Sequence, residues 1–411
     1  MDVIIITIGD ELLTGHTVDT NSAWMGINLN EKGFSIRKRI SIRDNREDII
    51  VAFDEALAEE DIVLVTGGLG PTSDDITKPV LCEYFNTELV LHEESLNLIK
   101  GFMKRRGYEL IQTNYNQAMV PAACSVLLNK MGTAPGMWFE KNGKILVSMP
   151  GVPYEMEYLM NTEVIPRLLE KFKPRQVLHR WAITQGIAEA FLADRLKDFE
   201  SKLPDYIRLA YLPSLGIIKL RLSVYEASQN EENILEEKYA DLQELVSDKI
   251  IGTSNDSLSE LVGKQLLKAN KTLALAESCT GGYIAHVITQ ISGSSAYFNG
   301  GVVAYSNEAK IDVLGVNSET IEQFGAVSIA TAKEMAEGVR KKIKSDFGIA
   351  TTGIAGPTGG TAEKPVGTVC IAIASETGTW ADKIVFSSDR TNNIIRSANT
   401  ALGQLIRLIN E

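Results

Sequence analysis

Three runs of apolar, largely β-branched residues in the first 150 positions constrain the fold more than any other feature. They cover residues 3–8, 61–66 and 144–149, and they lack the regular polar alternation of a half-exposed strand. Such runs are typical of strands buried on both faces, as in parallel sheets. Helical patterns at 20–32 and 46–59 lie between them. We therefore expect residues 1–170 to form a doubly wound α/β domain that binds ligands at the carboxyl ends of its strands.

The pattern changes after residue 170. Residues 171–252 read as a strand, a helix, two paired strands and a second helix, which predicts a small α+β domain. This order is similar to that of KH-like RNA-binding modules, but the stretch has no GxxG loop. We therefore interpret it as a KH-like spacer or dimer-forming unit.

A turn-rich stretch at 252–257 precedes a second α/β domain, which we expect over residues 253–411. Its predicted elements are strands at 273–276, 301–305, 347–352 and 368–374, and a closing helix at 392–409. The predicted fold is thus α/β, with two doubly wound α/β domains joined by a small α+β domain.

Charge and cysteine usage narrow the classes of function. The chain carries 41 Lys and Arg against 53 Asp and Glu, a net charge of −12, which disfavours direct binding of nucleic acid or of anionic membranes. The apolar run at 3–8 is far shorter than the ~20 residues that span a bilayer. The four cysteines form no CxxC pair, so we expect a cytoplasmic protein with reduced thiols, no secretory leader and small-molecule ligands.

The stretch at 272–282 leads from a buried strand into a Gly pair and a helix, which places Ser278 and Cys279 at a strand-to-helix elbow. Such an elbow exposes a nucleophile and directs backbone N–H groups at an oxyanion or a phosphate. The alternative is an ordinary helix cap. His286 lies two helical turns away, about 10 Å from Cys279 along one helix, and cannot activate it.

Lys310 is the better candidate for a base. With Asn307 as the N-cap, Lys310 falls in the first helical turn, where the helix dipole and burial both disfavour its charged form. The alternative is a solvated surface lysine. A third glycine-rich loop, at 351–360, follows another buried strand and can bring backbone amides to a phosphate, with Arg390 and Arg396 supplying charge.

The N-terminal domain has its own glycine turn, at 66–75, with Asp74 and Asp75 next to each other. Backbone amides there can hold a phosphate while the carboxylates hold a hard divalent ion. A turn followed by an Asp cap for the helix at 76 is the alternative. Further carboxylates and an amide, Asp10, Asp19 and Asn21, follow the first strand.

Three motifs in the C-terminal part resemble one known family. They are AESCTGG at 276–282, VAYSNEAK at 303–310 and TGIAGP at 352–357, and they are similar to the nicotinamide-nucleotide amidase domain of the CinA (competence/damage-inducible) proteins over 253–411. The resemblance implies that Ser278 attacks the carboxamide of nicotinamide mononucleotide, that Tyr305 and Lys310 relay protons, and that no cofactor is needed. It also implies a substrate-binding set: Thr280, Gly281, Gly282, Thr352, Gly353, Ala355, Gly356, Arg390 and Arg396.

The N-terminal motifs resemble the molybdopterin-binding domain of the same family, over residues 1–170. This resemblance implies hydrolysis of ADP-ribose to AMP and ribose 5-phosphate, with a divalent metal (Mg or Co) and potassium, in a homodimer. The family often has Thr where this chain has Asp10. The substrate-binding residues implied are Gly67, Gly68, Gly70, Thr72 and Asn21, and the metal ligands are Asp74, Asp75, Asp19 and Asp10.

Two rival functions remain open at this stage. One is molybdopterin binding or adenylyl transfer by the N-terminal domain, which shares the glycine and acidic pattern. The other is a non-catalytic partner of DNA recombination proteins, against which the acidic balance argues.

Overall fold

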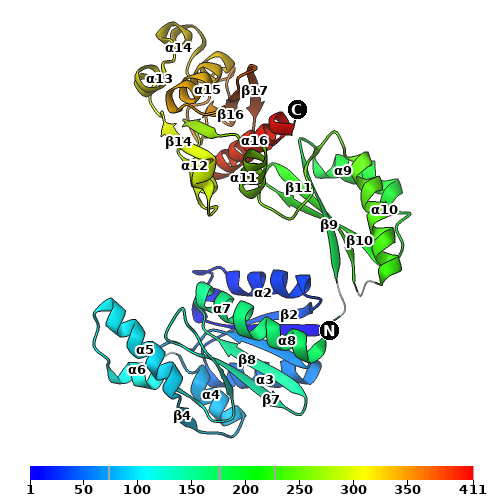
Figure 1. Ribbon diagram of the computed structural model, residues 1–411, viewed down its shortest axis with the longest axis vertical. Helices are drawn as coiled ribbons and strands as arrows, with labels where there is room; N and C mark the ends of the chain where they lie inside the picture. Colours follow the sequence, from blue (N-terminus) through cyan, green and yellow to red (C-terminus); the bar gives the residue numbers. More distant parts are fainter. Residues whose placement is uncertain (73–74, 175–176, 226–227, 411) are drawn as a thin grey trace. The chain divides into compact units, whose positions relative to one another are not determined.

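The computed structural model describes residues 1–72, 75–174, 177–225 and 228–410. It divides into two compact units, Met1–Leu178 with Tyr225–Gln229 and His179–Val224 with Asn230–Glu411. Both are built from sheets covered by helices (Figure 1), so the predicted α/β class is confirmed.

The first unit contains a six-stranded sheet in the order β2-β1-β3-β8-β7-β6. The strands β2, β1, β3 and β8 run parallel, while β7 and β6 are antiparallel additions at one edge. The three predicted strands correspond to β1, β3 and β8. The strand bounds are β1 Asp2–Ile8, β2 Ser35–Ile42, β3 Ile62–Thr66, β6 Ser125–Leu127, β7 Gly136–Lys141 and β8 Lys144–Met149.

Helices cover both faces of this sheet (Figure 1). On one face, α2, α7 and α8 pack Met25, Met156 and Leu168 against the strands, and on the other α3 and α4 pack Phe53 and Leu81. A smaller lobe holds α5, α6 and the two-stranded sheet β4-β5. The bounds are α1 Asp10–Leu13, α2 Thr20–Glu31, α3 Arg46–Glu59, α4 Thr77–Tyr84, β4 Leu89–Leu91, α5 Glu93–Arg106, α6 Gln112–Gln117, β5 Met119–Pro121, α7 Pro153–Leu159 and α8 Ile165–Phe172, with one π-helical turn at Met160–Val164.

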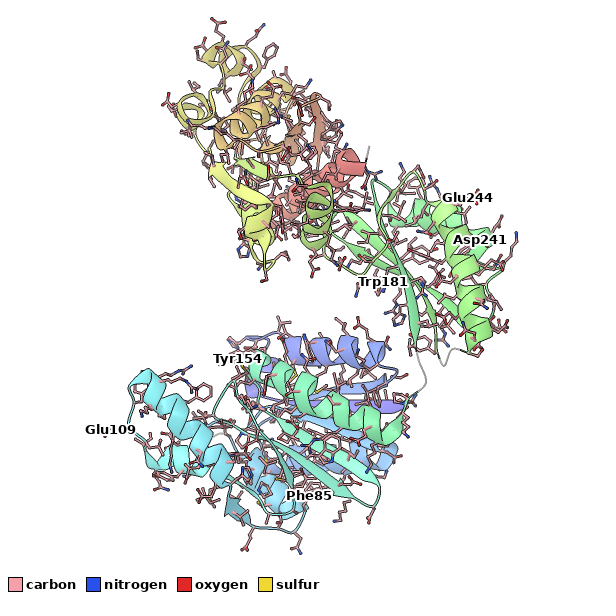
Figure 2. The ribbon with its side chains drawn as sticks, viewed as in Figure 1. Phe85, Glu109, Tyr154, Trp181, Asp241 and Glu244 are labelled. Carbon is pink, nitrogen blue, oxygen red and sulfur yellow. The ribbon has the colours of Figure 1, made fainter. Side chains whose placement is uncertain are left out.

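The second unit begins with a four-stranded sheet in the order β10-β11-β9-β12. Its element order agrees with the predicted α+β pattern and adds the short strand β12. One face of the long helix α10 stays in solvent, with Asp241 and Glu244 directed away from the sheet (Figure 2). The bounds are β9 Leu178–Gln185, α9 Glu189–Glu200, β10 Ile207–Ser214, β11 Ile217–Val224, α10 Gln229–Leu245 and β12 Ile250–Gly252.

The rest of this unit is a five-stranded sheet in the order β14-β13-β15-β16-β17. The strands β14, β13 and β15 are parallel, and β16 and β17 are antiparallel. Helices α11, α12 and α16 cover one face, and α15 covers the other. The bounds are α11 Leu258–Ala269, β13 Leu273–Glu277, α12 Tyr283–Thr289, a 3-10 turn Ser294–Ala296, β14 Phe298–Val303, α13 Asn307–Leu314, α14 Ser318–Phe324, α15 Ile329–Ile343, β15 Phe347–Gly353, β16 Thr368–Ala374, β17 Thr379–Val385 and α16 Arg390–Asn410.

This sheet differs from the prediction in two ways. The strand expected at 301–305 is β14, Phe298–Val303, because after Val303 the chain turns and only the Ala304 amide still bonds to the neighbouring strand, at the Glu277 carbonyl. Strand β17 was not predicted, because it has neither an unbroken apolar run nor a regular alternation of apolar and polar residues.

The four-stranded sheet shares a core with the five-stranded domain. Ile183, Ile217 and Ile251 are buried in one apolar cluster with residues of α11 and α16, and burying such a side chain contributes about 1.5–3 kcal/mol. The Gln185 side chain rests where Gly403 of α16 has no side chain, and its Nε2 donates to the Asn399 carbonyl at 2.8 Å. The domain boundaries predicted at 170/171 and 252/253 stay predictions.

Within the described residues, no helix is both long and apolar enough to cross a membrane.

Candidate functional site

The structure brings Ser278 and Lys310 together in the C-terminal domain. Ser278 follows β13 directly, and its amide donates to the Thr351 carbonyl of the next strand. Lys310 lies on α13, and its Nζ is 3.1 Å from Ser278 Oγ. Both side chains are buried, with exposed fractions of 7% for Ser278 and 1% for Lys310. A hydroxyl and an amine held this way form the pair expected of an activated nucleophile and its base.

Lys310 Nζ also contacts three backbone carbonyls. It lies 3.0 Å from the oxygen of Ala304, 3.2 Å from that of Tyr305 and 3.3 Å from that of Ser306. Burial lowers the pKa of Lys310 below its usual 10.5, against the opposing effects of Cys279 and Glu308. A neutral amine has two hydrogens for the carbonyls and a lone pair that can accept the Ser278 proton.

The predicted helix cap was wrong by one residue. The N-cap of α13 is Ser306, whose hydroxyl accepts from the Ala309 amide at 3.1 Å, because Asn307 has already entered the helix. Lys310 is therefore the fourth helical residue, and its side chain is buried rather than solvated.

Glu277 fills the N-terminus of α12. Its carboxylate is buried and accepts hydrogen bonds from the amides of Gly282, Ile284 and Ala285 at 2.9–3.1 Å. The expectation that these helix-start amides face a phosphate or an oxyanion was therefore wrong, because a side chain of the protein already neutralises them. Sequence reasoning missed Glu277, although an acid one residue before a helix-start nucleophile is a usable signal.

The remaining residues of the elbow differ in burial, since Cys279 and Thr280 are buried and Gly281 is exposed. Gly281 and Gly282 have φ values of 62° and 98°, which glycine adopts without steric cost. The Thr280 hydroxyl is 2.7 Å from that of Thr351 in the protein interior. Burial raises the pKa of the Cys279 thiol to about 12, so Cys279 is a core residue and not a thiolate at neutral pH.

Tyr305 and Arg390 form the exposed side of the site. Tyr305 is 60% exposed, and its hydroxyl accepts from Arg390 Nη2 at 3.0 Å. Arg390 Nη1 donates to the Gly356 carbonyl at 2.7 Å. The first residue of α16 thus connects the loops that follow β14 and β15. The roles of Tyr305 and Arg390 toward a substrate stay predictions.

The loop after β15 is fixed by its neighbours. Thr352 Oγ1 donates to the Ala326 carbonyl at 2.7 Å, and a side chain on Gly353 would meet the Thr368 carbonyl. The Ala355 carbonyl accepts from Nδ2 of the buried Asn393 at 3.0 Å, a residue that sequence reasoning missed. In the structure, Thr352, Gly353 and Ala355 contact other parts of the protein. Their contact with substrate stays a prediction.

Arg396 does not lie with Tyr305 and Arg390. It lies further along α16 and lines a different cavity, next to the β10–β11 hairpin. Six residues after Arg390, its side chain leaves the helix about 120° around the axis from that of Arg390.

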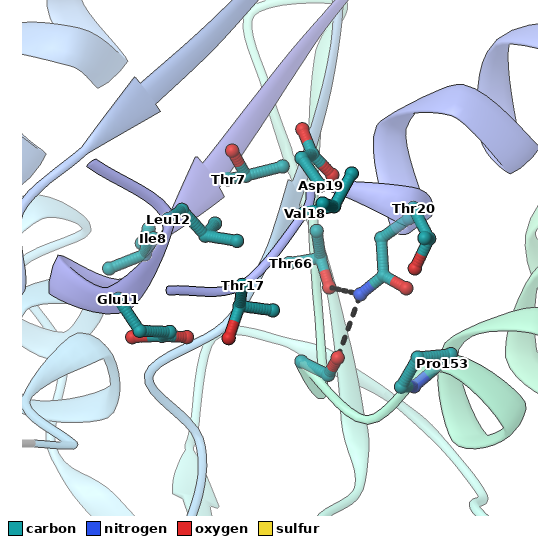
Figure 3. Close-up of a pocket in the computed structure, with 12 residues that line it drawn as sticks. Thr7, Ile8, Glu11, Leu12, Thr17, Val18, Asp19, Thr20, Thr66 and Pro153 are labelled. Atoms are coloured by element: carbon teal, nitrogen blue, oxygen red, sulfur yellow. Dashed lines mark hydrogen bonds between the residues drawn. The ribbon is translucent and has the colours of Figure 1, made fainter. Parts of the chain in front are cut away.

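The N-terminal domain has a cavity of about 100 Å³ at the carboxyl ends of β1 and β3 (Figure 3). Glu11, Asp19 and Thr66 line it. Asn21, at the start of α2, donates through Nδ2 to Thr66 Oγ1 at 3.2 Å and to the Gly151 carbonyl at 2.8 Å. This cavity alone is smaller than the roughly 300–1,000 Å³ of typical ligand pockets.

The glycine turn after β3 lies beside an acidic group. A side chain on Gly68 would meet Asp44 and Thr77, and one on Gly70 would meet Asp75, while Gly67 has φ 114°. Burial raises the pKa of Asp44, and the charges of Glu11, Asp10 and Asp75 raise it further. Asp44 was missed because it follows a basic strand.

The predicted metal ligands are not assembled as a set in the described part of the chain. Asp19 accepts from the Ser22 amide at 2.9 Å as the cap of α2, and Asp75 accepts from the Thr72 amide at 2.9 Å. Helix α4 begins after Ile76 with no side-chain cap, so Asp75 is not its cap. Asp74 lies outside the described residues, and no group of three His, Cys, Asp or Glu among the others could hold a metal ion. The divalent ion and potassium stay predictions.

Comparison with known proteins identifies the family. A "CinA-like protein" of Flavobacterium psychrophilum is 44% identical to this chain, and the alignment covers 100% of this chain and 99% of the relative. The chain belongs to the CinA family. A second CinA-like protein, from Cytophaga hutchinsonii, is 44% identical over 99% of this chain and 98% of its own length.

Two family models divide the CinA chain. The "CinA C-terminal domain" matches residues 255–409, and the "Probable molybdopterin binding domain" matches residues 4–170. Among solved structures, the competence/damage inducible protein CihA from Agrobacterium tumefaciens is 40% identical, covers 38% of this chain and 94% of its own, and has a TM-score of 0.36. The predicted resemblance to CinA proteins is thus confirmed, with a molybdopterin-binding-like domain at the N-terminus.

Proposed function

We propose that the C-terminal domain is an amidase that converts nicotinamide mononucleotide to nicotinic acid mononucleotide and ammonia. The observation that carries the proposal is the buried contact of 3.1 Å between Lys310 Nζ and Ser278 Oγ. Serine is a weak nucleophile unless a neighbouring base removes its proton. The lowered pKa of Lys310 supports that role.

In the first step, Ser278 Oγ attacks the carboxamide carbon and its proton passes to Lys310 Nζ. The tetrahedral species then collapses as the C–N bond breaks, and the leaving nitrogen takes that proton and departs as ammonia. A water molecule attacks the resulting ester, gives a proton to Lys310 Nζ and releases the carboxylic acid, while Ser278 recovers its hydroxyl proton. We assign the phosphate of the substrate to Arg390, whose guanidinium contacts the exposed Tyr305 beside the site.

The test is ammonia release from nicotinamide mononucleotide by the purified chain. Ser278→Ala should abolish it, whereas Cys279→Ala, a change in a buried thiol next to the nucleophile, should retain much of it. Activity that survives in Ser278→Ala but disappears in Cys279→Ala would contradict the assignment.

For the N-terminal domain we propose hydrolysis of ADP-ribose to AMP and ribose 5-phosphate. The supporting observations are the cavity at the carboxyl ends of β1 and β3, which Glu11 and Asp19 line, and the charges of Glu11, Asp10 and Asp75 that act on Asp44. Asp75→Asn keeps an oxygen for Thr72 but removes a charge, so it should fold normally and lose ADP-ribose turnover. Normal turnover together with tight binding of molybdopterin would favour the rival function instead.

A further inference from the structure

A second cavity in the C-terminal unit is not used by the proposed amidase. It has a volume of about 750 Å³ and lies between the β10–β11 hairpin, strand β17 and one face of α16. Neither Ser278 nor Lys310 lines it. Its volume falls within the roughly 300–1,000 Å³ of small-molecule sites. We call it the α16 cavity.

The face of α16 that lines the cavity carries a row of polar side chains. Arg396, Thr400, Gln404 and Arg407 are spaced by four, four and three residues, which places them on one face of a helix. Arg407 closes one end, because its guanidinium donates to the Gln185 and Lys249 carbonyls at 3.2–3.4 Å.

Arg396 has no such partner. Its Nε is buried without a hydrogen bond, and in the described part of the chain no carboxylate pairs with its guanidinium. Buried donors are nearly always paired in proteins, and a guanidinium fits the two oxygens of a phosphate or carboxylate. Because Arg396 lines the cavity without a carboxylate partner among the described residues, its guanidinium is available to an anionic ligand there.

The other walls define the rest of the ligand. The half-buried ring of Trp380 and the side chain of Phe386 line the cavity on the side of β17, and such rings favour a planar partner. Three carboxylates also line it, of which Asp248 is paired with Arg195 at 2.6 Å. Because these carboxylates offset the cations, the cavity suits one localised anionic group rather than a polyanion.

We infer that the α16 cavity binds a molecule of mononucleotide size, with its phosphate on Arg396 and its planar base against Trp380. This site is separate from both proposed activities.

The test uses the full chain, with AMP as the probe and adenosine as the matched compound without a phosphate. Calorimetric titration and tryptophan fluorescence should show saturable binding of AMP, at least tenfold weaker binding of adenosine, and loss of one AMP site in Arg396→Gln. Arg396→Lys, which keeps the charge, should restore part of the affinity. The matched control Arg390→Gln changes an arginine on the same helix outside the cavity and should keep this site.

Three results would overturn the inference. They are absence of saturable AMP binding up to millimolar concentration, equal affinity for adenosine, or unchanged stoichiometry and affinity in an Arg396→Gln protein that melts normally. Loss of the site in Arg390→Gln alone would place the nucleotide at the amidase site instead.

Discussion

Replacing Lys310 by methionine separates the chemical role of this side chain from its structural one. Methionine has a similar length and no charge, so it can fill the same buried space. The change removes the contact with Ser278 Oγ and the hydrogen bonds to three carbonyls.

The structural cost follows from those carbonyls. Tyr305 and Ser306 are exposed, so their carbonyls can bind water, whereas Ala304 is buried. One buried carbonyl without a partner costs about 1–3 kcal/mol, which is about 2–12 °C in Tm for a domain of this size. Burial already disfavours the charged amine of Lys310, so removing that amine offsets part of the lost stability. We therefore expect a fall in Tm in the lower half of the range of about 2–12 °C.

The catalytic cost is larger. A positioned general base contributes roughly 10²–10⁴ in rate, so ammonia release by Lys310→Met should fall by at least a hundredfold at a temperature where the variant is folded. Because the neutral amine is the active form and burial lowers its pKa below 10.5, the wild-type rate should rise with pH and level off above that pKa. The variant should lose this rise.

The assay measures ammonia from nicotinamide mononucleotide across pH, beside thermal unfolding of the same samples. Lys268→Met, on the exposed surface of α11, is the matched control and should behave as wild type. A Lys310→Met enzyme with a rate within about threefold of wild type, or with the wild-type pH profile, would refute the role of Lys310 as the base.

Three other experiments test the same reasoning. Glu277→Gln places a side-chain amide group against an N–H of α12, so Tm should fall by several degrees and kcat should drop more than KM rises. Glu277→Asp should lose less of both. An unchanged kcat in Glu277→Gln would show that the carboxylate does not position Ser278. Cys279 should react with thiol reagents only on unfolding, because burial raises its pKa to about 12, and rapid labelling of the native protein would contradict this. A fragment of residues 253–411 should melt below one of 179–411, since it lacks the packing of Ile183 and Ile217; equal melting temperatures would show that this shared core contributes little.

The sequence predicted what short-range chemistry determines. The buried strands are apolar runs, and the cap of α11 is equally local, since Ser257 and Glu260, three residues apart, form a capping box. Contacts across long separations were harder to predict. Lys310 was named as the base from its place at a helix start, but its contact with Ser278, 32 residues away, depends on how the chain turns after β14. Arg396 shows the limit of such prediction. It was correctly expected in the helix that closes the chain, to which Arg390 also belongs, but it lies on a different face of that helix from the one that borders the proposed amidase site.

Helix α16 connects the residues around Ser278 and Lys310 with the four-stranded sheet. Its first residue, Arg390, contacts Tyr305 and Gly356 at the proposed amidase site, and the Gln185 side chain of the four-stranded sheet packs against Gly403. Arg390 and Gly403 are 13 positions apart, which is about 20 Å along a helix at a rise of 1.5 Å per residue. A displacement of the four-stranded sheet along α16 would therefore move the Arg390 guanidinium at the other end of the helix, so the packing of that sheet helps to fix the geometry of the proposed amidase site.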